Sequence, residues 1–298
     1  MDTRAIGMGL AFALMWSSAF TSARFIVVDA SPLLALSVRY LISGLLGIAI
    51  ARAMGQSWHL TSDQWRATIL FGVCQNALYL GLFFVAMQTI EASLAAIIAS
   101  TMPLLVAVAS WAFLGERLKP LGILGLVLGM TGVVLIMGAR FQGGVDLYGL
   151  ALCCVGVLAL TFATMAVRRA TSGGSFLMIV GLQMLVGCVA LAIAALLFET
   201  PRLNPTPTLA IAFAYTTLVP GLIATLVWFF LVNRIGATRA ATFHFLNPFF
   251  GVAIASLFLA EALGPRDVIG VSIIAAGILA VQVSRQSGKL KSRSWSDP

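Results

Sequence analysis

Residues able to recognise a ligand gather on one face of the helix that we expect over residues 67–87. Counted in helical steps, this face carries Gly72, Gln75, Asn76, Tyr79 and Phe83. Their amide and phenol groups can form hydrogen bonds with a bound solute, and the aromatic rings can pack on an apolar one. Two interpretations stay open for this face: the wall of a ligand cavity, or hydrogen bonding between neighbouring helices.

Other apolar stretches add further candidates for ligand contact. Tryptophan, histidine and hydroxyl side chains suit an amphipathic ligand, and we assign five of them to the same predicted site: Trp16, Ser17, Ser100, Trp228 and His244. Trp228 could instead anchor a helix end at the membrane interface. His244 is the only group near the middle of a stretch that titrates around neutral pH. As an alternative to ligand or proton contact, it is a hydrogen-bonded packing residue.

These residues must be positioned by helices that cross a lipid bilayer. The 298-residue chain is 60% hydrophobic and 9% charged, whereas soluble domains carry about a quarter charged residues. Apolar runs close to the ~20 residues that span a bilayer recur along the whole chain. We predict an all-α membrane protein with ten spanning helices, over residues 5–23, 33–51, 67–87, 92–114, 121–139, 147–167, 175–198, 208–231, 237–260 and 267–284.

Arg39 is the only Lys or Arg well inside a predicted span. A buried cation in a membrane is costly unless it is paired. It could be the counter-ion of a substrate carboxylate or a gating contact. We favour a structural partner for carbonyl groups and polar side chains.

The acidic residues have the opposite distribution. All ten lie in loops, in tails or at helix ends: Asp2, Asp29, Asp63, Glu91, Glu116, Asp146, Glu199, Glu261, Asp267 and Asp297. No carboxylate is therefore available at mid-membrane to exchange protons for cations. We expect weak or absent carboxylate-based proton coupling and facilitated flux.

The sequence fits poorly with three other classes of protein: enzymes, metalloproteins and nucleic-acid-binding proteins. His59 and His244 cannot form a metal site alone, and the four cysteines lack paired spacing. The net charge of +8 comes from helix ends and the tail, with no basic domain to hold it. We therefore predict no enzyme activity, no metal and no cofactor, with a small-molecule substrate and the lipid bilayer as partners.

The positive charges distinguish the two sides of the membrane. With both termini inside, 13 of the 18 Lys and Arg fall on the inner side and four on the outer side, at Arg24, Arg140, Arg202 and Arg266. The positive-inside rule therefore predicts cytoplasmic termini. A cleaved signal peptide over the first apolar run is the alternative, but its removal would break this charge pattern.

The chain repeats itself at an offset of 145 residues. The segment from Thr101 matches the segment from Leu246 at eight of 35 positions, among them Pro103/Pro248, Glu116/Glu261, Pro120/Pro265, Gly125/Gly270 and Gly132/Gly277. Five helices per repeat give the second copy the opposite orientation, an arrangement that recurs in secondary transporters. We predict two inverted repeats, 1–140 and 141–285, followed by a basic cytoplasmic tail, 286–298.

Proline and glycine mark places where helices bend or approach closely. Pro220 with Gly221 predicts a kink that exposes carbonyl groups, and Pro103 and Pro248 predict bending points that let two halves rock. The G-x-x-x-G pair Gly125 and Gly129 fits a dimer face or, as we favour, packing within one chain. We expect a monomer, with a dimer as the alternative.

The quoted motifs resemble those of the drug/metabolite transporter superfamily, of the ten-helix EamA type. WSSAF at Trp16–Phe20 stands where the family often has W-G-x-x-F, with Ser17 in place of glycine; Pro32 precedes Arg39; and LGERL at Leu114–Leu118 is echoed by LAEAL. The resemblance covers nearly the whole chain. It implies a basket of helices around a central cavity, with the fifth and tenth helices outside, and an arginine at Arg39 whatever the substrate.

The resemblance also implies a bacterial inner-membrane exporter. Among the ten-helix members we favour the exporters of aromatic and neutral amino acids that YddG represents. A multidrug or other metabolite exporter, a channel, and a membrane assembly protein without transport activity stay open as alternatives.

Overall fold

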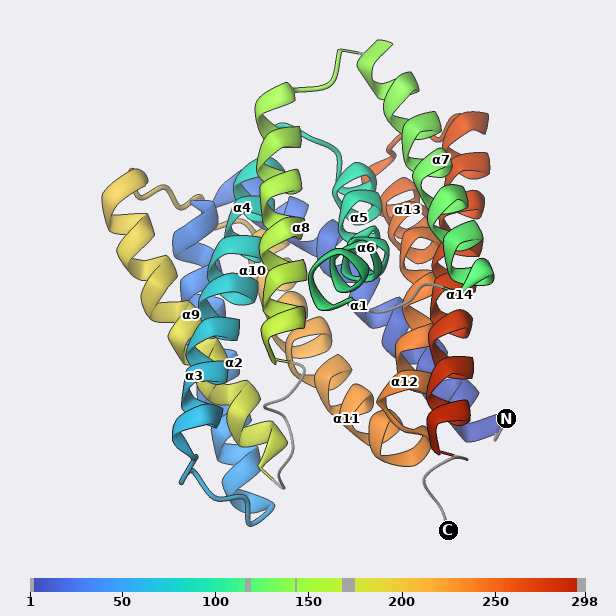
Figure 1. Cartoon of the computed structure of the whole chain (residues 1–298). Coiled ribbons are helices and arrows are strands. Elements are labelled where there is room, and N and C mark those ends of the chain that lie inside the picture. The colour runs from blue at the N-terminus through green and yellow to red at the C-terminus, as the bar shows by residue number, and fades with distance from the viewer. Residues whose placement is uncertain (1–2, 116–118, 143, 168–174, 294–298) are drawn as a thin grey trace. The chain divides into compact units, whose positions relative to one another are not determined.

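The computed structural model describes residues 3–115, 119–142, 144–167 and 175–293. Several charges used above, Asp2, Glu116, Arg117, Arg168, Arg169 and Asp297, lie outside these residues, as does Leu118. The described chain is helical (Figure 1), with the elements α1 (Thr3–Asp29), α2 (Pro32–Ala53), α3 (Ser62–Phe71), η1 (Gly72–Tyr79), α4 (Leu80–Ala86), α5 (Ala92–Ser100), α6 (Met102–Leu114), α7 (Pro120–Gln142), α8 (Leu147–Val167), α9 (Phe176–Phe198), α10 (Pro207–Leu218), η2 (Val219–Ile223), α11 (Ala224–Ile235), α12 (Ala237–Ala240), η3 (Ala241–Leu246), α13 (Asn247–Leu259) and α14 (Pro265–Arg293).

Ten helical stretches of the described chain are long and apolar enough to cross a membrane. This confirms the predicted ten-helix membrane fold. Four predicted bounds differ by four residues or more: the eighth span continues to Ile235 rather than ending at 231, the ninth begins at Ala241 rather than 237, and the first and third spans are longer than predicted. The first span continues to Asp29 rather than ending at 23, and the third begins at Ser62 rather than 67.

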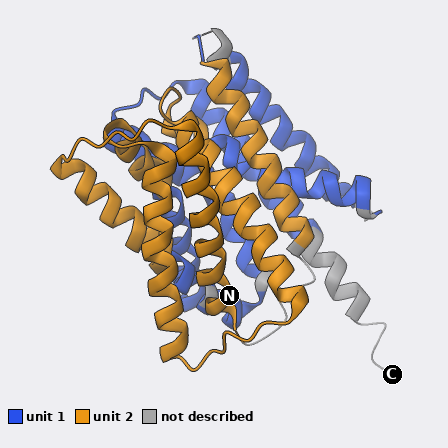
Figure 2. Ribbon diagram, turned by 90° about the vertical axis from the view of Figure 1, so that its left-hand side faces the viewer, with its two compact units in different colours: residues 1–18, 96–145, 224–298 blue, residues 19–95, 146–223 orange. Residues whose placement is uncertain are grey.

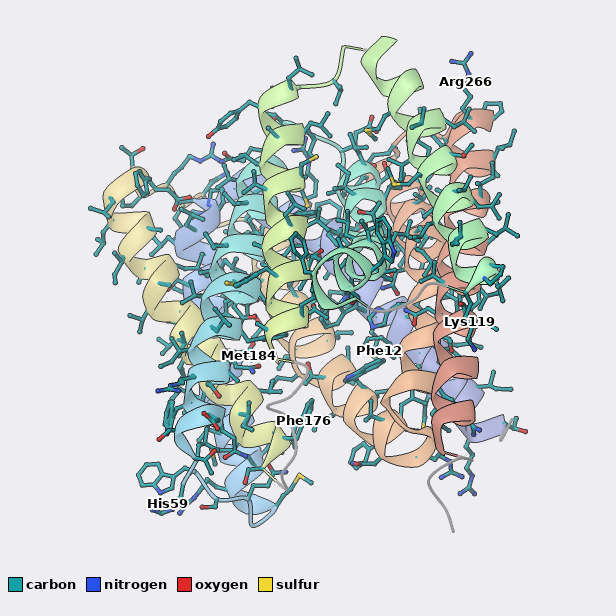
Figure 3. All side chains as sticks on the ribbon, in the orientation of Figure 1. Phe12, His59, Lys119, Phe176, Met184 and Arg266 are labelled. Carbon is teal, nitrogen blue, oxygen red and sulfur yellow. The ribbon has the colours of Figure 1, made fainter. Side chains whose placement is uncertain are left out.

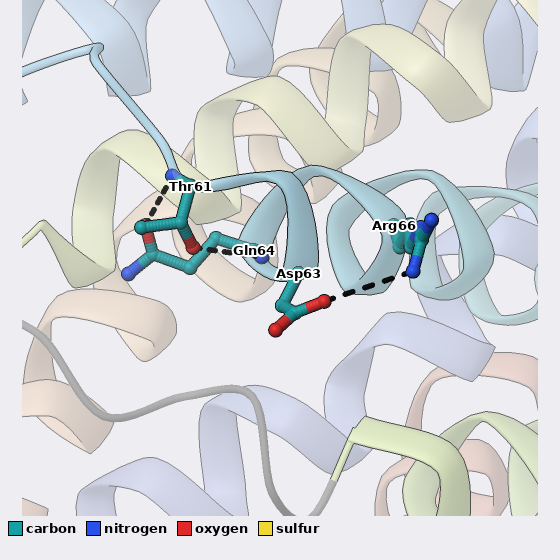
Figure 4. A network of polar contacts seen from close by, with 4 residues as sticks. All are labelled: Thr61, Asp63, Gln64 and Arg66. Carbon is teal, nitrogen blue, oxygen red and sulfur yellow. Dashed lines mark hydrogen bonds and ion pairs between the residues drawn. The ribbon is translucent and has the colours of Figure 1, made fainter.

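A capping box explains the early start of the third span (Figure 4). Thr61 Oγ1 accepts a hydrogen bond from the Gln64 amide, and Gln64 Oε1 accepts one from the Thr61 amide. These contacts satisfy two backbone donors that the first helical turn leaves open. The exposed pair Asp63 and Arg66 adds a 3.8 Å ion pair one turn along. The T-S-D-Q sequence was a readable signal that a count of apolar residues overlooks.

The chain forms two compact units that do not follow the predicted repeats (Figure 2). Unit 1 comprises residues 1–18, 96–145 and 224–298, and unit 2 comprises residues 19–95 and 146–223. Each unit therefore contains elements from both halves of the chain. The chain passes from one unit to the other within α1, within α5, just before α8, and between η2 and α11.

Unit 1 is built around the packing of α7 on α14, which lie side by side in Figure 1. An added Cβ at Gly125 would lie 2.7 Å from the Gly277 carbonyl oxygen, and one at Gly132 would lie 2.7 Å from the Gly270 carbonyl oxygen. Gly125 is the repeat equivalent of Gly270, and Gly132 that of Gly277. The two contacts are therefore the same contact with the repeats exchanged, as an antiparallel pair of inverted repeats requires.

Branched apolar side chains surround this glycine seam. Ile136, Ile274 and Ile278 are fully buried, and they pack with Leu104 of α6 and Val252 of α13. The glycines thus bring the two backbones together, while larger side chains on either side fill the remaining volume.

Unit 2 repeats this plan with α2 packed on α9. An added Cβ at Gly44 would lie 3.1 Å from the Gly181 carbonyl oxygen, so the two backbones approach closely. Further along the helices, Ser37 Oγ donates to the Cys188 carbonyl at 2.9 Å. Hydroxyl-to-carbonyl bonds of this kind join helices where lipid offers no other partner.

Each of these two helices has its first turn capped by a residue that follows the other helix. Glu199, after α9, accepts from the amides of Leu33 and Leu34 at 2.8 and 3.1 Å, at the start of α2. Gln56, after α2, accepts through Oε1 from the Met178 amide at 3.1 Å, at the start of α9. Helix starts carry partial positive charge, so both caps are stabilising.

We predict that Gly277→Ala destabilises the protein by about 1–3 kcal/mol, because overpacking displaces backbone. An added Cβ there would lie 2.5 Å from the Gly129 nitrogen and 2.6 Å from the Gly125 carbonyl oxygen. Thermal unfolding in detergent measures the change. Gly138→Ala on α7 is the matched control, because nothing lies within 4 Å of its added Cβ. Equal melting temperatures for the two variants would contradict this packing.

A second prediction concerns Asp146, just before α8. The hydrogen bond from Thr89 Oγ1 (2.6 Å), and next the one from the Gly149 amide, hold the pKa of this carboxyl below its usual range. A lowered pKa stabilises the fold above the unfolded-state value of about 4, and this stability is lost as pH falls through the folded-state value. Thr89→Val should therefore reduce the melting temperature at pH 7 and reduce its further loss on acidification. Parallel melting curves for Thr89→Val and wild type from pH 7 to pH 3 would refute this.

Candidate functional site

The predicted site residues fall into two sets, one in each unit. Unit 1 holds Trp16, Ser17, Ser100, Pro103, Trp228, His244 and Pro248, and unit 2 holds Arg39, Gln75, Asn76, Tyr79, Phe83, Pro220 and Gly221. Phe83 and Trp228 are 145 residues apart and so occupy matching positions in the repeats, but they belong to different units. Each set is described below on its own.

An aromatic cluster is the main feature of the unit 1 set. The ring of His244 lies 5.2 Å from that of Phe12, 5.2 Å from that of Trp228 and 6.5 Å from that of Trp16, measured between centroids. Phe12 also contacts both tryptophans, at 5.6 and 4.7 Å. Edge-to-face arrangements of this kind are favourable between aromatic rings. We call Phe12, Trp16, Trp228 and His244 the aromatic cluster; Phe12 projects from α1 (Figure 3).

Local structure around the cluster is set by Pro248. This proline occupies the first turn of α13, where its missing N–H is not needed, and the preceding residues form the 3₁₀ segment η3. Phe243 of η3 is buried against Gly9 of α1, so close that an added Cβ on that glycine would clash with the ring. The close approach brings His244 to the face of α1 that carries Phe12 and Trp16.

Two hydrogen bonds tie the cluster together. Asn247 Nδ2 lies 2.9 Å from His244 Nδ1, and the Asn247 carbonyl accepts from Ser17 Oγ at 3.2 Å. Ser17, predicted as a ligand contact, is fully buried and holds α1 to the start of α13. His244, Trp16, Trp228 and Asn247 are only partly buried. The cluster can thus offer ring faces and the imidazole to a ligand, whereas Ser17 is occupied by the protein.

The remaining unit 1 candidates, Ser100 and Pro103, lie at the helix break within the fourth span. Ser100 Oγ donates to the Ala96 carbonyl of its own helix at 2.6 Å. The α-helix is interrupted at Thr101, and Pro103 lies in the first turn of α6. Pro103 therefore stands at a break in its helix, as Pro248 does, whereas Ser100 has its hydroxyl bonded locally.

In unit 2, the predicted polar face lies on the π-helical segment η1. Asn76 Nδ2 donates to the Gln183 carbonyl of α9 at 2.9 Å, so this amide joins two helices. Tyr79 and Phe83 contact each other at 4.7 Å, and Phe20 of α1 lies 6.1 Å from Phe83. Half-buried Gln75 makes no side-chain hydrogen bond to any other described residue. Each of the two interpretations of this face therefore applies to one residue. Asn76 forms a hydrogen bond between two helices, whereas the amide of Gln75 is available to hydrogen-bond a ligand.

Arg39 contacts a carbonyl group that a proline has released. Pro220 lacks an N–H, so it cannot donate to the carbonyl of Thr216 four residues earlier. Arg39 Nε donates to that carbonyl at 3.2 Å, and its guanidinium also contacts Tyr40, whose ring centroid is 5.3 Å away. One residue on, the Thr217 carbonyl accepts from Ser43 Oγ at 3.4 Å. The kink predicted at Pro220 is a π-helical turn whose freed carbonyl is bonded to α2.

The space around this contact is closed by Gly221. An added Cβ there would lie 3.3 Å from Ser43 Oγ and 3.4 Å from an Arg39 terminal nitrogen. Glycine therefore lets α10 and η2 approach α2. π-Helical turns are often found at functional sites, and η1 and η2 end at Tyr79 and Ile223, which are 144 residues apart and so occupy matching positions in the repeats.

Sequence reasoning missed Phe12, Asn247, Thr216 and Ser43. Phe12 lies four residues before Trp16, and Asn247 lies three residues after His244. A search for i, i+3 and i+4 neighbours of the predicted residues could therefore have found both. Thr216 contacts Arg39 through its backbone carbonyl, so its side-chain type gives no signal. The sequence feature that indicated a free carbonyl there was Pro220, four residues later. No pattern pointed to Ser43.

The contact between Arg39 and Thr216 predicts a measurable coupling. Arg39→Ala should destabilise the protein by about 1.5–3 kcal/mol, since a charge-assisted hydrogen bond is lost and a carbonyl is left without a donor. In a Pro220→Ala background, an N–H can reach that carbonyl again, so the same substitution should cost less. Thermal unfolding of both single variants and the double variant gives the coupling energy. Arg52→Ala, at the exposed end of α2, is the control; strictly additive effects would exclude the proposed contact.

Two halves of the chain match the same family. The EamA-like transporter family matches residues 3–138 and again residues 147–282. The second match begins 144 residues after the first, close to the internal offset found in the sequence.

The chain is similar to proteins named as transporters over most of its length. The uncharacterized transporter YvbV of Bacillus subtilis is 26% identical over 277 residues, which cover 93% of this chain and 90% of that protein. The uncharacterized inner membrane transporter YedA of Escherichia coli is 24% identical over 283 residues, which cover 93% of this chain and 90% of that protein. A protein of known crystal structure shares the fold, with a TM-score of 0.69, 21% identity and coverage of 95% of this chain and 99% of the other.

The family and its named members are transporters rather than enzymes, as the sequence predicted. With ten spanning helices and two matches to one family model, the chain belongs to the EamA-like transporter family.

Proposed function

We propose that this transporter carries small, amphipathic and largely neutral metabolites, with aromatic and neutral amino acids as the foremost substrates. The observation that carries the proposal is the aromatic cluster of unit 1, where three partly or fully buried rings surround an imidazole. Such rings favour a flat apolar group, while Asn247 and His244 can hydrogen-bond a polar one. The amino-acid exporters that YddG represents remain the group that we favour.

The distribution of charge supports a neutral substrate. Among the described residues of the two π segments and the aromatic cluster, Arg39 is the one charged contact, and its Nε is bonded to a backbone carbonyl. A dedicated cation carrier would need a carboxylate at membrane depth, and a carrier of phosphorylated solutes would need several basic groups. An amino acid can be bound by neutral amides, hydroxyls and rings.

We further propose export by alternating access from the bacterial inner membrane, with both termini in the cytoplasm and with weak or no carboxylate-based proton coupling. The positive-inside distribution of Lys and Arg supports this orientation. The helix breaks at Thr101 and at η1, η2 and η3 support it as well, because inverted repeats exchange conformations through such places. The repeats 1–140 and 141–285 and the tail 286–298 are the units of that exchange.

Proteoliposome counterflow tests the substrate class. Purified protein should catalyse saturable exchange of labelled phenylalanine, with labelled sugar and a cationic drug as comparison solutes. Trp228→Ala should raise the KM for phenylalanine roughly tenfold, because an aromatic pair is worth about 0.5–1.5 kcal/mol beyond its buried area. Trp111→Ala, an exposed residue of α6, should leave KM unchanged.

The comparison solutes decide among the alternatives. Movement of the cationic drug alone would replace the amino-acid proposal with a multidrug exporter. Flux of all solutes without saturation would indicate a pore, and no flux from correctly folded protein would favour a membrane assembly role. Trp228→Phe, which keeps a ring, separates loss of stacking from loss of folding.

A further inference from the structure

Asn247 holds the one titratable group of the aromatic cluster in a specific protonation state. Its Nδ2 lies 2.9 Å from His244 Nδ1. An amide N–H can only donate, so in this arrangement Nδ1 accepts and the ring proton sits on Nε2. Asn247 thus selects one tautomer of the neutral imidazole.

The other end of the same amide has an unused acceptor. Asn247 Oδ1 is buried and receives no hydrogen bond from the described residues. A buried acceptor without a donor costs free energy. Rotating the amide by half a turn would present Oδ1 to Nδ1, but only a ring that carries a proton on Nδ1 could donate to it. Such a ring is either the neutral Nδ1–H tautomer or the imidazolium, so the turned amide accommodates an imidazole that holds an additional proton.

The surroundings of His244 suit that additional proton. The centroids of Phe12 and Trp228 lie 5.2 Å from that of His244, within the range of about 6 Å at which aromatic rings attract a cation, and Trp16 lies slightly farther away at 6.5 Å. The backbone of Asn247 is fixed by Ser17 through its carbonyl, so the side-chain amide can turn without moving the helix.

No ion pair competes for the imidazole within the described chain. The charged residues on the elements around η3 are Arg4, Arg24 and Asp29 of α1, Arg234 of α11, Arg239 of α12, and Arg266, Asp267, Arg285, Lys289, Lys291 and Arg293 of α14; α13 carries none. All contacts of His244 are accounted for by the three rings and Asn247. The Asn247 amide is therefore the polar group that must accommodate a change of protonation.

We propose that His244 and Asn247 form a proton-binding site, with Asn247 as the positioning residue whose amide turns when the ring takes up a proton. One proton from water adds to Nδ1, the ring gains one positive charge, and the amide changes from donor to acceptor. Given the transport proposed above, this proton occupies the same aromatic cluster as the substrate. Flux then depends on pH through this imidazole rather than through a carboxylate.

Tryptophan fluorescence tests the site without any substrate, because a neighbouring imidazolium quenches an indole. His59 also lies beside a tryptophan, 6.1 Å from Trp58, so the experiment uses a His59→Gln background in lipid nanodiscs. We expect a quenching transition on acidification that His244→Gln abolishes. Trp228→Phe should remove most of its amplitude, and Trp111→Phe should leave it unchanged. A transition that persists in His244→Gln, or no transition at all, overturns the proposal.

Substitutions of Asn247 test its positioning role. Asn247→Leu removes the acceptor that an imidazolium needs, so the transition should move to lower pH by about one unit. Asn247→Asp supplies acceptor oxygens alone, so the transition should move to higher pH by a similar amount. If Asn247 were merely structural, the transition would shift in the same direction in both variants or would not shift in either. Either result overturns the role of Asn247.

Phenylalanine counterflow separates this proposal from the proposed function. Flux in the His59→Gln background should change severalfold across the pH range of the fluorescence transition, and His244→Gln should flatten that profile. A fluorescence transition without phenylalanine counterflow would refute the substrate class and retain the proton site. Counterflow whose pH profile survives in His244→Gln would refute the coupling and retain the transporter.

Discussion

The hydrocarbon core of a membrane supplies no hydrogen-bond partner, and this constraint underlies most of the described structure. Helix starts, carbonyl groups freed by proline and most buried hydroxyls therefore bond to other groups of the chain; among the described residues, the hydroxyls of Thr21 and Thr68 are buried without a partner. Glu199 and Gln56 therefore cap helices that are distant in sequence, and Arg39 bonds the carbonyl that Pro220 releases. The hydroxyls of Ser17 and Ser37 likewise donate to backbone carbonyls of other helices. The polar residues of the spans are for the most part already committed to holding the fold.

The same constraint explains why glycine dominates the helix contacts. Between helices in lipid, apolar burial gives little driving force, so stability comes from close packing and from backbone approach. The α7–α14 seam in unit 1 and the α2–α9 seam in unit 2 both use this device. In the α7–α14 seam the glycine contact recurs with the repeats exchanged, so one sequence feature fixes two places. An inverted duplication thereby supplies self-complementary surfaces without separate optimisation of each.

The sequence predicted the number of spans well because hydropathy is a property of whole segments. It predicted the ends less well at Asp29 and Ser62; at Ser62 a capping box rather than an apolar run sets the start of the helix. The Pro220 kink could be anticipated, since a missing N–H is visible in the sequence, but its partner could not. Arg39 and Thr216 meet through tertiary packing, and no spacing encodes that contact. For the same reason Phe12 and Trp16 could not be joined to Trp228 and His244, which lie more than 200 residues away.

Once committed side chains are set aside, few groups remain to meet a solute. Asn76, Ser17 and Ser100 are bonded within the protein, so three of the predicted ligand contacts have their polar atoms occupied. In unit 1 the rings of the aromatic cluster and the imidazole remain, and in unit 2 Gln75 remains. Rings bind through dispersion and stacking, which tolerate many shapes, whereas one imidazole and a few amides impose weak polar selection. Such a set favours breadth over strict selectivity, and it makes the state of a single imidazole the largest change of charge that the cluster can undergo.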